Sequence, residues 1–143
     1  MDNRAPNALL EAYRCTTYRL AAPGGYIDIR IGRRHPRLDV LLSALSVTEW
    51  AFITAWNPGS NLGSTAQNTA AQVELERIVR EGGHAFYPGE GIPDLAGWAP
   101  ERSLWIAGVA RAAAVELGRR FGQKAIVVGS SGASAELLLC DET

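Results

Sequence analysis

The segment from Trp50 to Trp56, with the sequence WAFITAW, constrains the fold more than any other part of the chain. It is apolar on both faces, since alternate residues of a strand point to opposite sides of a sheet. A strand of this kind is buried on both sides, so we expect it in the middle of a sheet. The face with large side chains becomes polar towards its end, whereas the other face suits close packing of a helix. The first face carries Trp50, Phe52, Thr54 and Trp56, and the second carries Ala51, Ile53 and Ala55.

The predicted elements follow the order α-β-β-α-β-α-β-β-α-β-β along the chain. Helices and strands interleave, which is typical of a sheet with helices packed on it. Hairpins are expected at both ends, around the turn signals Pro-Gly-Gly at 23–25 and Ser-Ser-Gly-Ala-Ser at 130–134. These patterns predict an α+β fold: a single domain over residues 1–143, with a mixed, mainly antiparallel sheet and three to four packed helices.

The composition is that of an ordinary soluble domain, with 47% hydrophobic residues, 20% charged residues and a net charge of −1. This balance gives no global attraction to nucleic acid or to an acidic membrane. The local basic stretch, which contains Arg30, Arg33, Arg34 and Arg37, is better explained as a solvated loop than as a nucleic-acid contact. No apolar run is long enough to span a bilayer, and residues 1–14 lack the pattern of a secretory signal, so we expect a cytoplasmic protein.

The chain has two cysteines, Cys15 and Cys140, near its opposite ends. Neither lies in a spacing that would suit a metal site, so we expect no metal and no cofactor. A disulfide between them is possible, but two reduced thiols fit a cytosolic protein better.

Residues 84–101 are rich in glycine and proline, which predicts a short strand and then a long ordered loop folded over the domain. This stretch contains His84, Glu90 and Glu101. Two such groups can serve as general acid and base if the fold brings them into one cleft. Exposed side chains are the simpler interpretation. The catalytic alternative is a small hydrolase or transferase that uses these three residues.

A second group of polar residues surrounds the start of a predicted helix. Ser64 and Gln67 fit a capping box, which begins a helix that should end near Glu81. Asn68 then lies on the core-facing stripe of this helix, where an unpaired amide costs about 1–3 kcal/mol. Its expected partners are Asn57 and the loop that follows, including Ser60. These groups either tie the loop down or hold a ligand, and the helix N-terminus offers N–H groups to an anion.

Gln123 follows a predicted helix end, where it can serve as a C-cap partner or as a ligand contact. Together these residues predict a pocket for a small polar or anionic ligand. The candidate ligand-binding residues are Thr54, Trp56, Asn57, Ser60, Asn68, Glu90 and Gln123. A third function, a protein-interaction or regulatory domain without a catalytic site, predicts an exposed apolar patch around Trp50, Trp98 or Trp105.

Three blocks of the sequence resemble a known family of small bacterial proteins, catalogued as DUF3293, a domain of unknown function. They are FITAWNPGS at 52–60, GEG at 89–91 followed by GWAPERSLWIAG at 97–108, and LGRRFGQKAIVVG at 117–129. Lys124 departs from the asparagine usual in the last block. The resemblance implies no activity. It implies that the motif positions to test are Thr54, Asn57, Ser60, Asn68, Glu90, Glu101 and Gln123.

Overall fold

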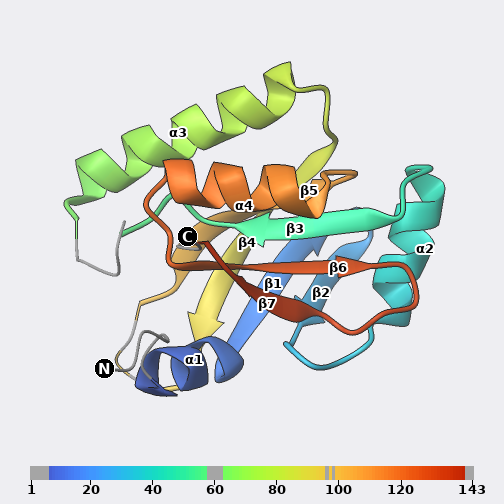
Figure 1. Cartoon of the computed structure of the whole chain (residues 1–143), viewed down its shortest axis with the longest axis horizontal. Helices are drawn as coiled ribbons and strands as arrows, with labels where there is room; N and C mark the ends of the chain where they lie inside the picture. The colour runs from blue at the N-terminus through green and yellow to red at the C-terminus, as the bar shows by residue number, and fades with distance from the viewer. Residues whose placement is uncertain (1–6, 58–62, 96, 98, 141–143) are drawn as a thin grey trace.

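The computed structural model describes residues 7–57, 63–95, 97 and 99–140, and they form an α+β domain around one sheet (Figure 1). The helices are α1 (Asn7–Arg14), α2 (Pro36–Ala44), α3 (Thr65–Glu81) and α4 (Arg111–Arg120). The strands are β1 (Thr16–Ala22), β2 (Gly25–Ile29), β3 (Glu49–Ile53), β4 (Phe86–Pro93), β5 (Glu101–Ala107), β6 (Ala125–Ser130) and β7 (Glu136–Leu139). This order confirms the predicted succession of elements and the α+β fold.

The strands lie in the order β2-β1-β4-β5-β3-β6-β7, and each neighbouring pair is antiparallel. The hairpins β1–β2 and β6–β7 form the two edges, as the turn signals predicted. Strand β3 lies between β5 and β6, which confirms the central position expected from its two apolar faces. The sheet is therefore mainly antiparallel, with its most apolar strand protected on both sides.

The sheet curls until its two edges meet. Ile31, just after β2, forms an isolated parallel bridge with Ala135, just before β7. The backbone N–H of Gly32 donates to the Ala135 carbonyl at 2.8 Å, and the Ala135 N–H donates to the Arg33 carbonyl at 3.0 Å. The curl gives the sheet a concave and a convex face. Helices α3 and α4 cover the convex face, while α1 and α2 lie at opposite ends of the sheet (Figure 1).

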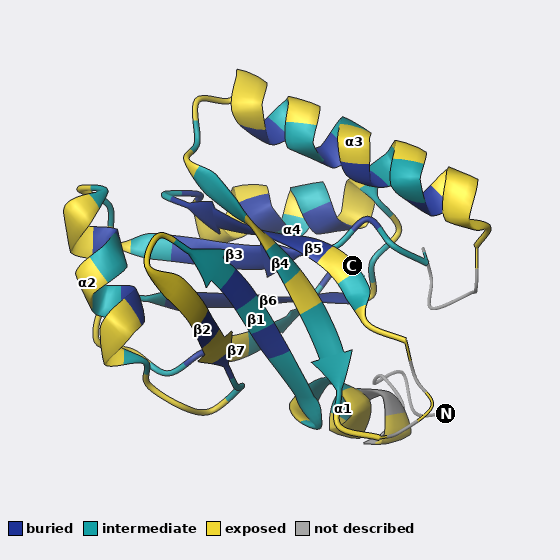
Figure 2. Cartoon of the chain, turned by 180° about the vertical axis from the view of Figure 1, so that it is seen from behind, coloured by how far each residue is buried: buried dark blue, intermediate teal, exposed yellow. Residues whose placement is uncertain are grey.

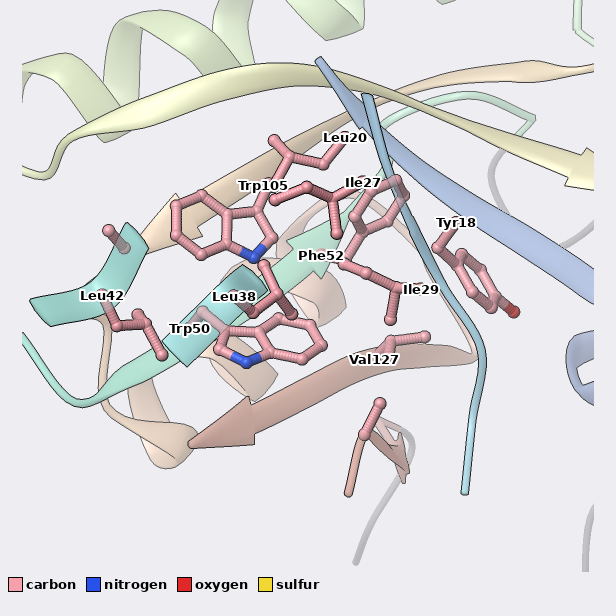
Figure 3. Packing of buried hydrophobic residues seen from close by; sticks show 12 residues of the cluster. Tyr18, Leu20, Ile27, Ile29, Leu38, Leu42, Trp50, Phe52, Trp105 and Val127 are labelled. Carbon is pink, nitrogen blue, oxygen red and sulfur yellow. The ribbon is translucent and has the colours of Figure 1, made fainter. Parts of the chain in front are cut away.

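The concave face is filled by large side chains, several of them aromatic (Figure 3). The Trp105 ring stacks on Trp50, with centroids 6.4 Å apart, and on Tyr87, at 6.1 Å. Tyr18 meets Phe52 edge to face at 5.4 Å. Trp50 and Trp105 are only 3% and 0% exposed. The prediction of an exposed apolar patch around these two residues is therefore wrong, because both rings are part of the core. The third residue of that prediction, Trp98, lies outside the described residues.

The convex face of β3 carries the small side chains that the alternation predicted. Ala51, Ile53 and Ala55 are buried in a second core beneath the helices. Figure 2 shows the buried side of α3 turned towards the sheet and its exposed side towards solvent. Helix α4 approaches closely at Gly118, where a Cβ atom would lie 2.7 Å from Ile126 Cγ2 and 2.8 Å from Cys140 Sγ. The lack of a side chain at Gly118 allows this close packing of α4 on the sheet.

Strand β4 corrects the prediction of a short strand and a long loop. Phe86–Pro93 forms an eight-residue strand between β1 and β5. Gly89 is required there, because a Cβ atom would lie 2.7 Å from the Phe52 ring and 3.0 Å from the Arg19 carbonyl. Pro88 lies just past the last β1 pair, Leu20–Gly89, so it is paired only with β5. The glycine and the proline that suggested a loop thus meet packing and pairing demands within a strand.

The two cysteines do not form a disulfide. Cys15 donates its Sγ–H to Glu11 Oε2 at 3.3 Å, and Cys140 is buried in the core beneath α4. Among the residues that the structure describes, no three His, Cys, Asp or Glu side chains gather as metal ligands. Within the same residues, no helix has the length and the apolar character needed to cross a membrane.

Candidate functional site

A pocket of about 380 Å³ opens at the α1 end of the concave face. Strands β1, β5 and β6 begin there, and β3 and β4 end there, so five strands and α1 contribute to its lining. Its apolar wall includes Tyr13, Tyr18, Phe52, Pro93, Ala125 and Val127. Its polar lining comprises Thr16, Thr54, Asn57, Glu101, Ser103 and Gln123. A mostly apolar hollow with a few polar groups is the usual form of a small-molecule site.

A glycine leaves room in the middle of the pocket wall. Gly91 of β4 pairs with Tyr18 of β1 on one side and with Glu101 of β5 on the other. A Cβ atom at Gly91 would meet only Thr16 Cγ2, at 3.8 Å. The space above Gly91 is therefore open, and it separates an aromatic wall from a carboxylate.

Two asparagines hold the edge of the pocket together. Asn68 Oδ1 accepts the Asn57 backbone N–H at 2.9 Å, and Asn68 Nδ2 donates to Asn57 Oδ1 at 2.8 Å. Asn68 is 3% exposed, as expected for an amide on the core-facing stripe. The capping box of Ser64 and Gln67 is also formed. The prediction that Asn57 and Asn68 tie the chain down is therefore confirmed.

Gln72, one turn after Asn68 on α3, was missed by the sequence interpretation. It is 1% exposed, and its Oε1 accepts the Ala55 backbone N–H at 3.4 Å. Gln72 and Asn68 thus accept hydrogen bonds from the backbone N–H groups of Ala55 and Asn57, which follow β3. The signal in the sequence was the four-residue spacing of two amides on one helix face. These contacts place Asn57 at a fixed position on the pocket edge.

Asn57 has a left-handed backbone conformation, with φ of 48°, which turns the chain sharply after β3. Asparagine tolerates this region better than most residues. Its side chain then makes two further contacts. Nδ2 donates to Glu101 Oε2 at 2.9 Å, and Oδ1 accepts the Gly63 N–H at 3.0 Å. One residue thus links the end of β3, the start of α3 and the carboxylate of the pocket.

Thr54 and Gln123 line the pocket while bonding to the fold. Thr54 Oγ1 donates to the Arg102 carbonyl at 2.6 Å and accepts the Trp56 N–H at 2.9 Å. Gln123 Nε2 donates to the carbonyls of Trp56 and Phe121, each at 3.2 Å. The bond to Phe121 confirms the expected C-cap contact at the end of α4.

Among the described residues that line the pocket, Glu101 is the only one with a carboxyl group, and none is basic. Its partial burial raises the pKa of the carboxyl group, and the hydrogen bond from Asn57 opposes this rise. The phenols of the pocket stay neutral at ordinary pH. Burial, with smaller contributions from Cys140 and Glu101, raises the pKa of Tyr13 to about 12, and burial also raises the pKa of Tyr18.

The other two acid/base candidates lie elsewhere. Glu90 pairs with Arg19 and Arg102, next to Gly91 and Glu101, so its side chain points to the convex face of the sheet, at a position where it is exposed. His84 lines a separate hollow of about 400 Å³ between α3 and α4. Because the three candidates lie on three surfaces, no two of them meet in one cleft, and the expected acid/base pair does not form.

The remaining candidates contribute less to the pocket. The Trp56 backbone is bonded to Thr54 and Gln123, and its side chain is not part of the lining. Ser60 lies outside the described residues. In the basic stretch, Arg30 forms an ion pair with Asp94 at 2.8 Å, and Arg37 donates to the Tyr26 carbonyl. Two of the four arginines therefore already serve the fold.

A comparison with models of protein families shows which family this chain belongs to. A family model described as a protein of unknown function, DUF3293, matches residues 53–126, which is more than half of the chain. The chain belongs to the DUF3293 family. Comparisons with curated proteins and with solved structures gave no match. The DUF3293 match includes Thr54, Asn57, Glu101 and Gln123 of the pocket, whereas the α1 and β1 wall lies before it.

Proposed function

We propose that this DUF3293 domain binds a small polar molecule in the pocket at the α1 end of the sheet. The observation that carries the proposal is the cavity itself, about 380 Å³ with an aromatic wall and a polar edge. A compact fold of this size normally fills its interior with side chains. Here the open volume lies directly beside polar groups that are held in fixed positions.

The proposed site differs from the one expected from the sequence. Thr54, Asn57 and Gln123 remain in it, and Asn68 supports it from α3 through Asn57. Glu101 joins them, while Glu90 is left out because it points away from the cavity. Thr54 and Asn68 are already bonded within the protein, so they support the shape of the pocket more than they contact a ligand. The hydrolase or transferase alternative retains only Glu101 in the pocket, and no observation favours it.

A ligand screen tests the proposal. Purified protein would be heated with amino acids, sugars, nucleotides, amines and small carboxylic acids, and the melting temperature recorded for each. A ligand at 100 times its dissociation constant stabilises the native state by about 2.7 kcal/mol, which is readily measured. We expect at least one class of small molecule to raise the melting temperature.

Two variants show whether the pocket is responsible. Gly91→Val places a side chain in the open space of the wall, and we expect it to abolish the stabilisation. Glu90→Val, the neighbouring residue on the exposed face, is the matched control and should respond as the parent does. The proposal fails if no ligand changes the melting temperature. It also fails if a ligand that stabilises the parent protein stabilises the Gly91→Val variant equally well.

Other expectations from the sequence stay proposals. A cytoplasmic location and a bacterial source fit the composition and the family resemblance. Nucleic acid is not a favoured partner, since the net charge is −1 and Arg30 and Arg37 are bonded within the fold.

A further inference from the structure

The hydrogen-bond donors of the pocket are largely used by the protein itself. Both N–H groups of Gln123 Nε2 donate to backbone carbonyls. The hydroxyls of Thr54 and Tyr18 donate to the carbonyls of Arg102 and Tyr13, the latter at 2.8 Å. Ser103 Oγ donates to the Glu101 carbonyl at 3.2 Å. Among the described side chains of the lining, the Tyr13 hydroxyl and one N–H of Asn57 Nδ2 remain able to donate to a ligand.

The acceptors are less occupied. Asn57 binds Oε2 of the Glu101 carboxylate, whereas within the described part of the chain no hydrogen bond reaches Oε1. The same holds for Gln123 Oε1, since both bonds of that side chain are made through its nitrogen. An ionised carboxylate has about four lone-pair positions, so most of the accepting capacity of Glu101 remains. The free hydrogen-bonding capacity of the described lining is thus weighted towards acceptors, and one of these is a carboxylate.

The charges around the cavity favour the same kind of ligand. No arginine, lysine or histidine is among the described residues that line it, and Glu101 supplies the one formal charge. An anion would face this carboxylate without a cation to offset the repulsion. A cation would gain a charge-assisted hydrogen bond, which is stronger than a neutral one. The aromatic rings of Tyr13, Tyr18 and Phe52 also suit an ammonium group or an apolar body.

We propose that the ligand is a small hydrophobic amine, whose ammonium group donates to Glu101 while an aromatic or aliphatic body rests against Tyr13, Tyr18 and Phe52. This inference rests on the proposed function, because it assigns the ligand class of the same pocket. It also chooses between the two ligand types that the sequence left open, since it excludes an anion.

Three probes with the same aromatic body test the charge preference: 2-phenylethylamine, 2-phenylethanol and 3-phenylpropanoate. Their affinities would be measured at neutral pH by titration calorimetry and by NMR shift changes in ¹⁵N-labelled protein. We expect the amine to bind at least about tenfold more tightly than the carboxylate, the factor typical of one hydrogen bond to a charged group. The amide signals of residues around the pocket should shift.

Two isosteric variants locate the effect. Glu101→Gln should weaken binding of the amine about tenfold and leave binding of the alcohol nearly unchanged. Glu90→Gln removes the same charge from the adjacent strand, on the opposite face of the sheet, and should bind the amine as the parent does. Circular dichroism and the ¹⁵N spectrum show that each variant is folded.

The outcomes separate the inference from the proposed function. If the carboxylate or the alcohol binds as well as the amine, or if Glu101→Gln leaves the amine affinity unchanged, the amine assignment is wrong while the pocket still binds ligands. If none of the three probes binds, the amine assignment is also overturned. If, in addition, every compound of the broader screen leaves the melting temperature unchanged, the proposed function fails as well.

Discussion

Asn57 and Asn68 are joined by two hydrogen bonds that run in opposite directions, from a backbone N–H to an amide oxygen and from an amide nitrogen back to an amide oxygen. The pair connects the end of β3 with the first turn of α3. Because Asn57 also donates to Glu101, the same pair fixes the carboxylate of the pocket. The two asparagines that hold the turn after β3 therefore also determine the shape of the pocket edge.

Removing the helix partner should be costly. We expect Asn68→Ala to lower the free energy of unfolding by about 2 kcal/mol, since it leaves the Asn57 backbone N–H without its acceptor and removes one of the two hydrogen bonds to Asn57 Oδ1. Urea unfolding would measure the change. Val73→Ala, at an exposed position of the same helix, serves as the control and should change stability by less than about 0.5 kcal/mol. Equal effects of the two substitutions would show that the asparagine pair contributes nothing specific.

The backbone of Asn57 gives a second prediction. Asn57→Ala and Asn57→Gly lose the same side-chain hydrogen bonds, but alanine must also adopt a φ of 48°. We expect the alanine variant to be less stable than the glycine variant by about 1 kcal/mol, the cost of a left-handed conformation for a residue with a Cβ atom. Chemical denaturation of both proteins measures this difference. A glycine variant no more stable than the alanine variant would contradict the strained conformation.

Two glycines of β4 should respond differently to the same change. Gly89→Ala places a Cβ atom 2.7 Å from the Phe52 ring, and we expect a loss of about 1–3 kcal/mol from overpacking. Gly91→Ala, two residues later and on the same face, meets only Thr16 Cγ2 at 3.8 Å and should be tolerated. Denaturant midpoints of the two variants provide the comparison. Similar losses at both positions would mean that general strand propensity, and not contact with Phe52, determines the need for glycine.

The raised pKa of Glu101 predicts how the effect of replacing this residue on stability changes with pH. Because this pKa is raised in the folded state, ionisation of Glu101 favours the unfolded state, and the stability present below the ordinary value of 4.5 is lost as the pH rises through the folded pKa. The stability of Glu101→Gln relative to the parent should therefore increase between acid and neutral pH. Unfolding measured across this range would test the sign.

Asp94 provides a control with the opposite sign. The hydrogen bond from Arg30 lowers the Asp94 pKa below its ordinary value of 3.8, so its stabilising effect is present above that value and is lost as the pH falls through the lower folded pKa. The stability of Asp94→Asn relative to the parent should decrease as the pH rises. Equal pH trends for the two variants would contradict the difference in their environments.

The fold was predictable where local signals were sufficient. The capping box at Ser64 and Gln67 fixes the start of α3 through residues three apart, and the two apolar faces of β3 identify a central strand. Strand β4 was not predictable in this way. Its Gly89 is required by Phe52, which belongs to a different strand and is distant in the sequence. A glycine in a strand and a glycine in a turn look the same until that neighbour is known.

The site was predictable only in part, for a related reason. Asn57 and Asn68 lie only 11 residues apart in the sequence, so their pairing could be inferred from helix periodicity. Glu90 and Glu101 were treated alike because both were placed in one loop. Once β4 and β5 pair, the register puts Glu90 opposite Arg102 and Gly91 opposite Glu101, which sends the two carboxylates to different faces. Tyr18 joins the pocket through the pairing of β1 with β4, which places it opposite Gly91, and no local pattern specifies this pairing.

The position of β3 also has a consequence for synthesis of the chain. Both of its neighbours, β5 and β6, are encoded after it, so a nascent chain that has just left the ribosome presents β3 with unpaired backbone groups and two uncovered apolar faces. Such delayed, long-range pairing slows folding and favours association between incomplete chains. We expect β3 to be the segment most dependent on protection during translation, until the residues of β6 have emerged.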